Sequence, residues 1–125
     1  IAYQIFDDLA DFFGQESKVG KTLGTDLGSG KLTLPSMELL EASSDTEKTA
    51  ILAEITGDSP PQPELRVRQM QDLGVFSRVE DVLERELSKG ENALRPHADL
   101  PPTPRLLSLS AILRAQIAGL RPQAR

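Results

Sequence analysis

The amino-acid sequence predicts an all-α protein. Apolar residues recur three or four positions apart in every segment long enough to form a secondary-structure element. Glycines and prolines stand between these segments, where they end one helix and separate it from the next. The sequence shows no strand-like alternation, internal repeat or low-complexity tract. With 125 residues, the chain has the length of one domain.

The first segment is predicted to be a helix that carries three aspartates. Its apolar positions are Ile1, Ile5, Phe6, Leu9, Phe12 and Phe13, with Gly14 placed to end the helix. Asp7 and Asp11 are one helical turn apart, and Asp8 lies beside both. Two carboxylates about 4 Å apart repel by roughly 4 kcal/mol at an effective dielectric near 20. The spacing therefore indicates a bound cation, and hard oxygen ligands suit Mg²⁺. The alternative is a solvated acidic face.

A segment rich in glycine, lysine and hydroxyl residues follows, over residues 15–35, and is predicted to be a loop. Lysine is a compact charge for a phosphate, and glycine lets backbone N–H groups approach an anion closely. Acids for a metal followed by lysines for a phosphate indicate a metal–diphosphate site, whereas the alternative is an ordinary flexible linker. Gly20-Lys21-Thr22 is only a weak match to a P-loop, because no strand precedes it.

Two short helices are predicted after the loop. The first covers residues 36–42, with Thr33 as a cap, and the second covers 45–56, where Ser44 and Glu47 form a capping box. Their predicted inward positions are Met37, Leu39, Leu40, Ala50, Ile51, Leu52 and Ile55.

Three further helices are predicted at 64–73, 78–95 and 105–118. Ser77 and Glu80 form a capping box for the second of them. Thr103 is expected to cap the last helix, and Gly119 to end it. The predicted inward positions are Leu65, Val67, Met70, Leu73, Val79, Val82, Leu83, Leu87, Leu94, Leu106, Leu107, Leu109, Ile112, Leu113 and Ile117.

Two proline-rich stretches, 58–63 and 96–104, separate these helices. The first is interpreted as a stiff connection between helices, with a polyproline recognition motif as the alternative. The second contains His97, which is the single histidine of the chain and has no second nitrogen ligand near it. His97 is therefore expected to be a surface residue.

Composition excludes several classes of function. The net charge of −5 is unfavourable for a nucleic-acid or anionic-membrane surface. No apolar run approaches the roughly 20 residues that span a bilayer, and no secretory signal is visible. The sequence has no cysteine and hence neither a disulfide nor a thiolate metal site. A cytoplasmic location is the default expectation.

The first 35 residues also carry a dense set of motifs at fixed spacing: Tyr3-Gln4-Ile5, Asp7-Asp8, Asp11, Gly14, Gly20-Lys21, Asp26-Leu27, Gly30-Lys31 and Thr33-Leu34-Pro35. Together they resemble the second aspartate-rich region of the trans-isoprenyl diphosphate synthases, the polyprenyl synthetase family. The resemblance implies an isoprenoid-synthase-type helical bundle, of which this chain would form the C-terminal helices. Residues 30–35 look more like bacterial medium- or long-chain synthases than eukaryotic farnesyl synthases.

The same resemblance implies roles for individual residues. Asp7, Asp8 and Asp11 would bind Mg²⁺, with Asp7 as the foremost direct ligand, and Asp26 would support the metal-bound water. Lys21, Lys31 and Gln4 would bind the substrate diphosphate and take part in catalysis, with Gln4 near the reacting substrates. The implied reaction is a Mg²⁺-dependent head-to-tail condensation of isopentenyl diphosphate with an allylic diphosphate. The full enzyme is expected to be a homodimer.

Family members carry two aspartate-rich motifs, whereas this sequence has one. Residues 1–125 are therefore interpreted as the C-terminal part of a polyprenyl synthetase domain whose N-terminal part is absent, and the isolated chain is expected to have little or no synthase activity. Two alternatives stay open. One is a non-catalytic subunit or truncated paralogue that supports a partner synthase, and the other is an unrelated helical interaction module.

Overall fold

The protein is helical throughout the part of the chain that the structure describes. The computed structural model describes residues 1–13, 27 and 29–121, and no strand occurs in these ranges. The elements in chain order are α1 (Ala2–Phe13), α4 (Leu34–Ala42), α5 (Asp45–Thr56), α6 (Pro63–Asp72), α7 (Val75–Leu94), the 3₁₀ turn η1 (Arg95–His97) and α8 (Thr103–Leu120). The all-α prediction is confirmed. Within the described ranges, no helix is both long enough and apolar enough to cross a membrane.

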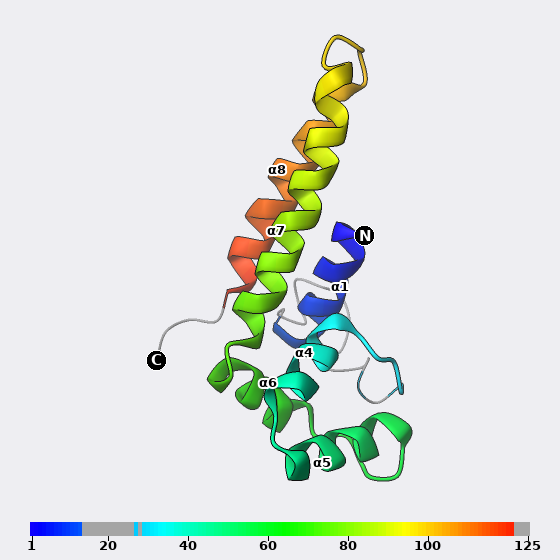
Figure 1. Ribbon diagram of the computed structural model, residues 1–125, viewed down its shortest axis with the longest axis vertical. Helices are drawn as coiled ribbons and strands as arrows, with labels where there is room; N and C mark the ends of the chain where they lie inside the picture. The colour runs from blue at the N-terminus through cyan, green and yellow to red at the C-terminus, as the bar shows by residue number, and fades with distance from the viewer. Residues whose placement is uncertain (14–26, 28, 122–125) are drawn as a thin grey trace.

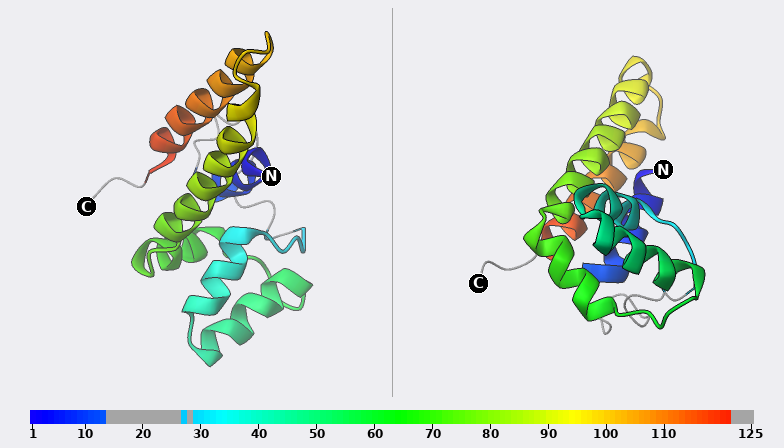
Figure 2. Two further views of the ribbon diagram at one scale, coloured as in Figure 1. Left: turned by 45° about the horizontal axis from the view of Figure 1, so that its top comes forward. Right: turned by 60° about the horizontal axis from the view of Figure 1, so that its bottom comes forward.

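The long helix α7 is the element on which the others pack. It contacts α1, α4, α6 and α8, and α1 also contacts α4 and α8. Figures 1 and 2 show α7 and α8 side by side and joined at one end, with α1 beside them and α4, α5 and α6 grouped near the other end of α7. The first helix, which carries the aspartates, is thus held between α7, α8 and α4.

The core explains why α7 is central. Its inner positions Val75, Val79 and Leu83 are fully buried, as the spacing of apolar residues predicts for the last two. They join one cluster with side chains from all the other α-helices and from Leu27. The further buried members are Ile5, Leu9, Phe12, Leu27, Leu39, Ile51, Met70, Phe76, Leu87, Leu113 and Ile117.

The Ser44 half of the first predicted capping box is confirmed, whereas the Glu47 carboxylate binds Arg66 and Gln69. Ser44 is the N-cap of α5, and its side chain accepts a hydrogen bond from the Glu47 N–H at 3.4 Å. The second box is wrong, because α7 begins at Val75 and Ser77 lies inside the helix. Gly74 precedes the helix in the left-handed conformation, with φ of 70°, which lets Val75 begin the helix and enter the core.

Two other helix starts also differ from the prediction. The helix α4 begins at Leu34, and the hydroxyl of its N-cap residue Thr33 lies 3.2 Å from the Ser36 hydroxyl without bonding the helix backbone. Thr103 lies inside α8, and its hydroxyl donates to the His97 carbonyl oxygen at 2.6 Å. In both cases the buried hydroxyl finds a partner other than the one that a cap would use.

Several apolar residues predicted to face inward are exposed. They are Met37, Ala50, Leu52, Leu65, Leu73, Leu106, Leu109 and Ile112. The reason is clearest in α8, which packs on α7 and α1 and buries Leu113 and Ile117. The helix is apolar around most of its circumference, so the sequence does not tell which side faces the neighbours.

Candidate functional site

Helix α1 carries the three aspartates and places them in different surroundings. Asp8 is 7% exposed and Asp11 is fully buried, whereas Asp7 is half-buried. Burying a carboxylate is unfavourable unless it is paired or hydrogen-bonded. The burial of Asp8 and Asp11 therefore contradicts the alternative of a solvated acidic face.

Asp8 is the point at which two distant segments of the site meet. Its Oδ1 accepts a hydrogen bond from Gln4 Nε2 at 3.1 Å and lies 3.4 Å from Lys31 Nζ. Gln4 is one helical turn before Asp8, whereas Lys31 comes from the segment that leads into α4. The Lys31 side chain is 49% exposed, so its ammonium group touches the buried acid and remains accessible to solvent. The structure thus joins three of the predicted site residues.

Asp7 lines a groove between α1 and the end of α8. The groove has a volume of about 470 Å³ and is lined by Tyr3, Phe6, Asp7, Ala10, Gln116, Gly119 and Leu120. The rings of Tyr3 and Phe6 lie next to each other in it, with centroids 6.3 Å apart. Polar groups, including Asp7 and Gln116, and apolar groups share the wall of the groove, which suits a ligand with both a polar and an apolar part.

The described acids do not form a metal site by themselves. Among residues 1–13, 27 and 29–121, no three histidine, cysteine, aspartate or glutamate side chains are arranged so that they could hold a metal ion together. Mg²⁺ usually takes one or two carboxylates and completes its shell with water and substrate phosphates. Carboxylates on α1 and an accessible lysine beside them match that requirement.

Two of the predicted site residues, Lys21 and Asp26, lie outside the described residues. The diphosphate-binding role of Lys21 and the water-shell role of Asp26 therefore stay predictions. The other predicted site residues, which are Gln4, the three aspartates and Lys31, all lie within the described residues.

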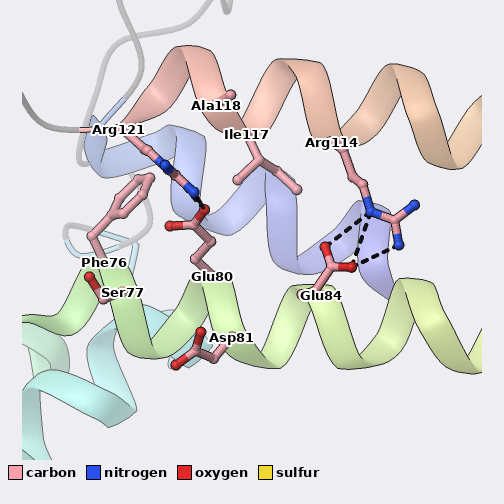
Figure 3. A pocket seen from close by; sticks show the side chains of 9 residues that line it. All are labelled: Phe76, Ser77, Glu80, Asp81, Glu84, Arg114, Ile117, Ala118 and Arg121. Atoms are coloured by element: carbon pink, nitrogen blue, oxygen red, sulfur yellow. Dashed lines mark hydrogen bonds and ion pairs between the residues drawn. The ribbon is translucent and has the colours of Figure 1, made fainter.

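A second hollow of about 660 Å³ lies between α7 and α8 (Figure 3). Glu84 pairs with Arg114 across it at 2.8 Å, and Glu80 pairs with Arg121. Arg114 also binds Glu91 at 2.7 Å, and this hydrogen bond lowers the pKa of Glu91 and raises that of Arg114. Since carboxylates of α7 already bind both arginines, the hollow has the character of a helix–helix contact.

The sequence analysis missed a buried polar network between α5 and α6. Arg66 Nε donates to Glu54 Oε2 at 2.6 Å, and Nη2 donates to Oε1 at 3.2 Å. Both residues are 2% exposed. The available signal was their spacing, since Glu54 follows the buried Ile51 by three residues and Arg66 precedes the buried Met70 by four.

Comparison with known proteins gives the family. The polyprenyl synthetase family matches residues 1–73, well beyond the 35 residues on which the sequence motifs lie. Heptaprenyl diphosphate synthase component 2 of Geobacillus stearothermophilus is 33% identical over 94 residues, which are 75% of this chain and 27% of that protein. No solved structure matches the chain.

Two other relatives are also prenyl synthases. The short chain isoprenyl diphosphate synthase of Methanothermobacter thermautotrophicus is 34% identical over 53 residues, which are 42% of this chain and 16% of that protein. The all-trans-nonaprenyl-diphosphate synthase (geranyl-diphosphate specific) of Rhodobacter capsulatus is 28% identical over 100 residues, or 80% of this chain and 30% of that protein. The chain thus spans at most 30% of the length of these relatives. Because the family match covers more than half of its residues and begins on the helix that carries Asp7, Asp8 and Asp11, the chain belongs to the polyprenyl synthetase family.

Proposed function

We propose that this chain supplies the second metal- and diphosphate-binding region of a prenyltransferase. The enzyme would join isopentenyl diphosphate head to tail to an allylic diphosphate and release a polyprenyl diphosphate five carbons longer. The observation that carries the proposal is the contact between Asp8 and Lys31, which puts an accessible cation beside the acids of α1. Family membership and the prenyl synthases among the relatives support the reaction class.

The acids form the metal side of the proposed site. Asp7, Asp8 and Asp11 would hold Mg²⁺ together with oxygens of the bound diphosphate, and Asp26 would support the metal-bound water. When bound, Mg²⁺ supplies positive charge beside the leaving diphosphate. The half-buried Asp7 is the foremost direct ligand, because it lines an open groove whereas Asp11 is fully buried.

The lysines form the phosphate side. As the allylic carbon–oxygen bond breaks, its electron pair leaves with the diphosphate, and Lys31 and Lys21 would neutralise the growing charge. The double bond of isopentenyl diphosphate then attacks the allylic carbon, and loss of a proton completes the product. Gln4, which donates to Asp8, would hold that acid in place beside the substrates.

The proposal extends to the whole protein. We place the chain in the C-terminal part of a polyprenyl synthetase domain, where the family carries its second aspartate-rich motif. The whole enzyme would work as a homodimer in the cytoplasm, which size-exclusion chromatography and cell fractionation test directly.

The experiment is a prenyltransferase assay of the full-length protein with Asp7→Asn. Turnover should fall by at least about 100-fold, the effect of losing one electrostatic stabiliser in an active site, and the dependence on Mg²⁺ should change. Glu41→Gln, which neutralises an exposed acid on α4, is the matched control and should leave both unchanged. Normal turnover and normal Mg²⁺ dependence in Asp7→Asn would refute the assignment.

One relative favours a second candidate function. The protein from Geobacillus stearothermophilus is named as component 2 of a heptaprenyl diphosphate synthase. That name implies an enzyme of more than one component, so the second candidate is that this chain belongs to a subunit that works with a partner synthase, and the non-catalytic supporting subunit is one form of it. A full-length reading frame that has no further aspartate-rich motif upstream of Asp7, and an inactive purified product, would favour this candidate over the first.

A further inference from the structure

The segment that carries Lys31 rests against the end of α5. Gly30 has a φ of 73°, and a Cβ atom built on it would lie 3.0 Å from the carbonyl oxygen of Ile55. Its own N–H donates to the carbonyl oxygen of the buried Leu27 at 3.4 Å. A residue other than glycine would thus be strained in its backbone and would also push against the last turn of α5. Figure 1 shows this segment, in cyan, leading into α4.

Side chains of α6 bind the end of α5 through the Arg66–Glu54 pair. Glu54, which precedes Ile55, is bound through both oxygens by the guanidinium of Arg66. The same guanidinium donates from Nη1 to Gln69 Oε1 at 2.6 Å and to Glu47 Oε2 at 3.3 Å. Gln69 Nε2 closes the network on Glu47 Oε2 at 2.7 Å.

A bidentate guanidinium–carboxylate pair fixes orientation in a way that apolar contacts do not. Leucine or isoleucine side chains tolerate small rotations of a helix, whereas two parallel hydrogen bonds lose strength when the donors and acceptors move out of line. Burial makes it costly to break the Arg66–Glu54 pair, because each side chain belongs to a residue that is 2% exposed and would be left as an unpaired buried charge. The pair therefore sets how α5 is rotated and where the Ile55 carbonyl points.

We propose that Arg66 and Glu54 are positioning residues for Lys31. They fix the Ile55 carbonyl, Gly30 packs on that carbonyl, and Lys31 is thereby held beside Asp8. The consequence for ligand binding rests on the proposed function, since it takes Lys31 to be a diphosphate ligand. The mechanical part, that the α5–α6 pair determines where Lys31 lies, is independent of it.

The test measures the position of residue 31 directly. The chain has no cysteine, so Lys31→Cys and Arg85→Cys take two spin labels at defined places, one on the segment and one on the exposed face of α7. A second pair, Glu41→Cys with Arg85→Cys, reports whether α4 and α7 keep their arrangement. Pulsed electron–electron double resonance then gives a distribution of distances between the two labels of each pair.

Two variants disturb the proposed linkage, and each has a matched control. Gly30→Ala adds a methyl group against Ile55, whereas Gly74→Ala meets the same backbone strain, at φ of 70°, outside α5 and with only the Arg78 side chain, at 3.9 Å, near the new Cβ. Glu54→Gln removes the charge of the buried pair, whereas Glu84→Gln removes the charge of an exposed one. Circular dichroism identifies the folded variants.

Gly30→Ala and Glu54→Gln should each shift or broaden the distribution of the 31–85 distance and leave the 41–85 distance unchanged. Both control variants should leave both distances unchanged.

Without the labels, Gly30→Ala and Glu54→Gln should bind inorganic pyrophosphate with Mg²⁺ about tenfold more weakly, which corresponds to the loss of one charge-assisted hydrogen bond. A 31–85 distance equal to that of the controls would overturn the proposal, and Glu54→Gln decides if Gly30→Ala does not fold. If the unmutated chain binds no pyrophosphate, the proposed function fails, but the distances still decide on the positioning role.

Discussion

At the scale of single residues, burial decides how much the loss of one partner of an ion pair costs. Arg66 and Glu54 are both 2% exposed and satisfy each other, so removing one leaves the other as an uncompensated charge. Surface pairs such as Lys89 with Glu86, at 3.1 Å, contribute little, because water screens them. Burial therefore decides which ion pairs matter.

Replacing Arg66 by leucine should lower the free energy of unfolding by about 3–5 kcal/mol, since Glu54 is then buried without a partner. Lys89→Met, which breaks an exposed pair, should cost about 0–1 kcal/mol. Urea unfolding followed by circular dichroism measures both. Equal effects of the two variants would contradict the ranking by burial.

The ion pairs between α7 and α8 should make stability depend on acid. The hydrogen bond from Arg114 lowers the pKa of Glu91 in the folded state, so the unfolded chain binds protons more readily. The contribution of Glu91 is fully present above the unfolded pKa of about 4.3 and is lost as the pH falls through the lower folded value. Glu91→Gln should weaken the loss of thermal stability below that pH, and an unchanged slope would show that the pair contributes nothing.

At the scale of the helices, the sequence predicted which elements exist better than where they begin. Each predicted helix is present, because the spacing of apolar residues marks a helix however it packs. The Ser77–Glu80 and Ser44–Glu47 boxes have the same sequence pattern, so the sequence alone could not show that Ser77 does not cap a helix. What separates them is tertiary: Val75 and Phe76 are buried, and α7 includes them.

This difference gives a prediction with a built-in control. Ser44→Ala removes a cap whose hydroxyl accepts the Glu47 N–H and should lower the free energy of unfolding by about 0.5–2 kcal/mol. Ser77 is exposed inside α7, so Ser77→Ala should be neutral or slightly stabilising, because alanine favours helix. Thermal unfolding of both variants distinguishes them, and a larger loss in Ser77→Ala would mean that α7 begins as the sequence pattern suggested.

On the scale of the whole molecule, α7 is the element whose core residues should matter most. Leu83 is fully buried against the other helices, whereas Leu109 on α8 is 59% exposed. Leu83→Ala should therefore cost about 2–5 kcal/mol of unfolding free energy, and Leu109→Ala less than about 1 kcal/mol. Chemical denaturation of the pair measures the difference, and similar costs would argue against the described packing of α8.

The same scale shows what could be predicted of the site. The three aspartates and Gln4 are local, since they lie on one helix that the sequence predicted, and Gln4 contacts Asp8 one turn away. The approach of Lys31 to Asp8 depends on how the segment packs on α5 and α1, which the spacing of residues does not encode. The family resemblance, and not periodicity, brought these residues together in the prediction. The Arg66–Glu54 pair had neither a motif nor local proximity to reveal it.

The most direct test is isothermal titration of the chain with inorganic pyrophosphate in the presence of Mg²⁺. If the acids of α1 and Lys31 form a metal–diphosphate site, the unmutated chain and Glu41→Gln should bind pyrophosphate only when Mg²⁺ is present. Asp7→Asn and Lys31→Met should each lose that binding. Absence of Mg²⁺-dependent heat in the unmutated chain, or equal binding by all four proteins, would contradict a magnesium–diphosphate site on this helix.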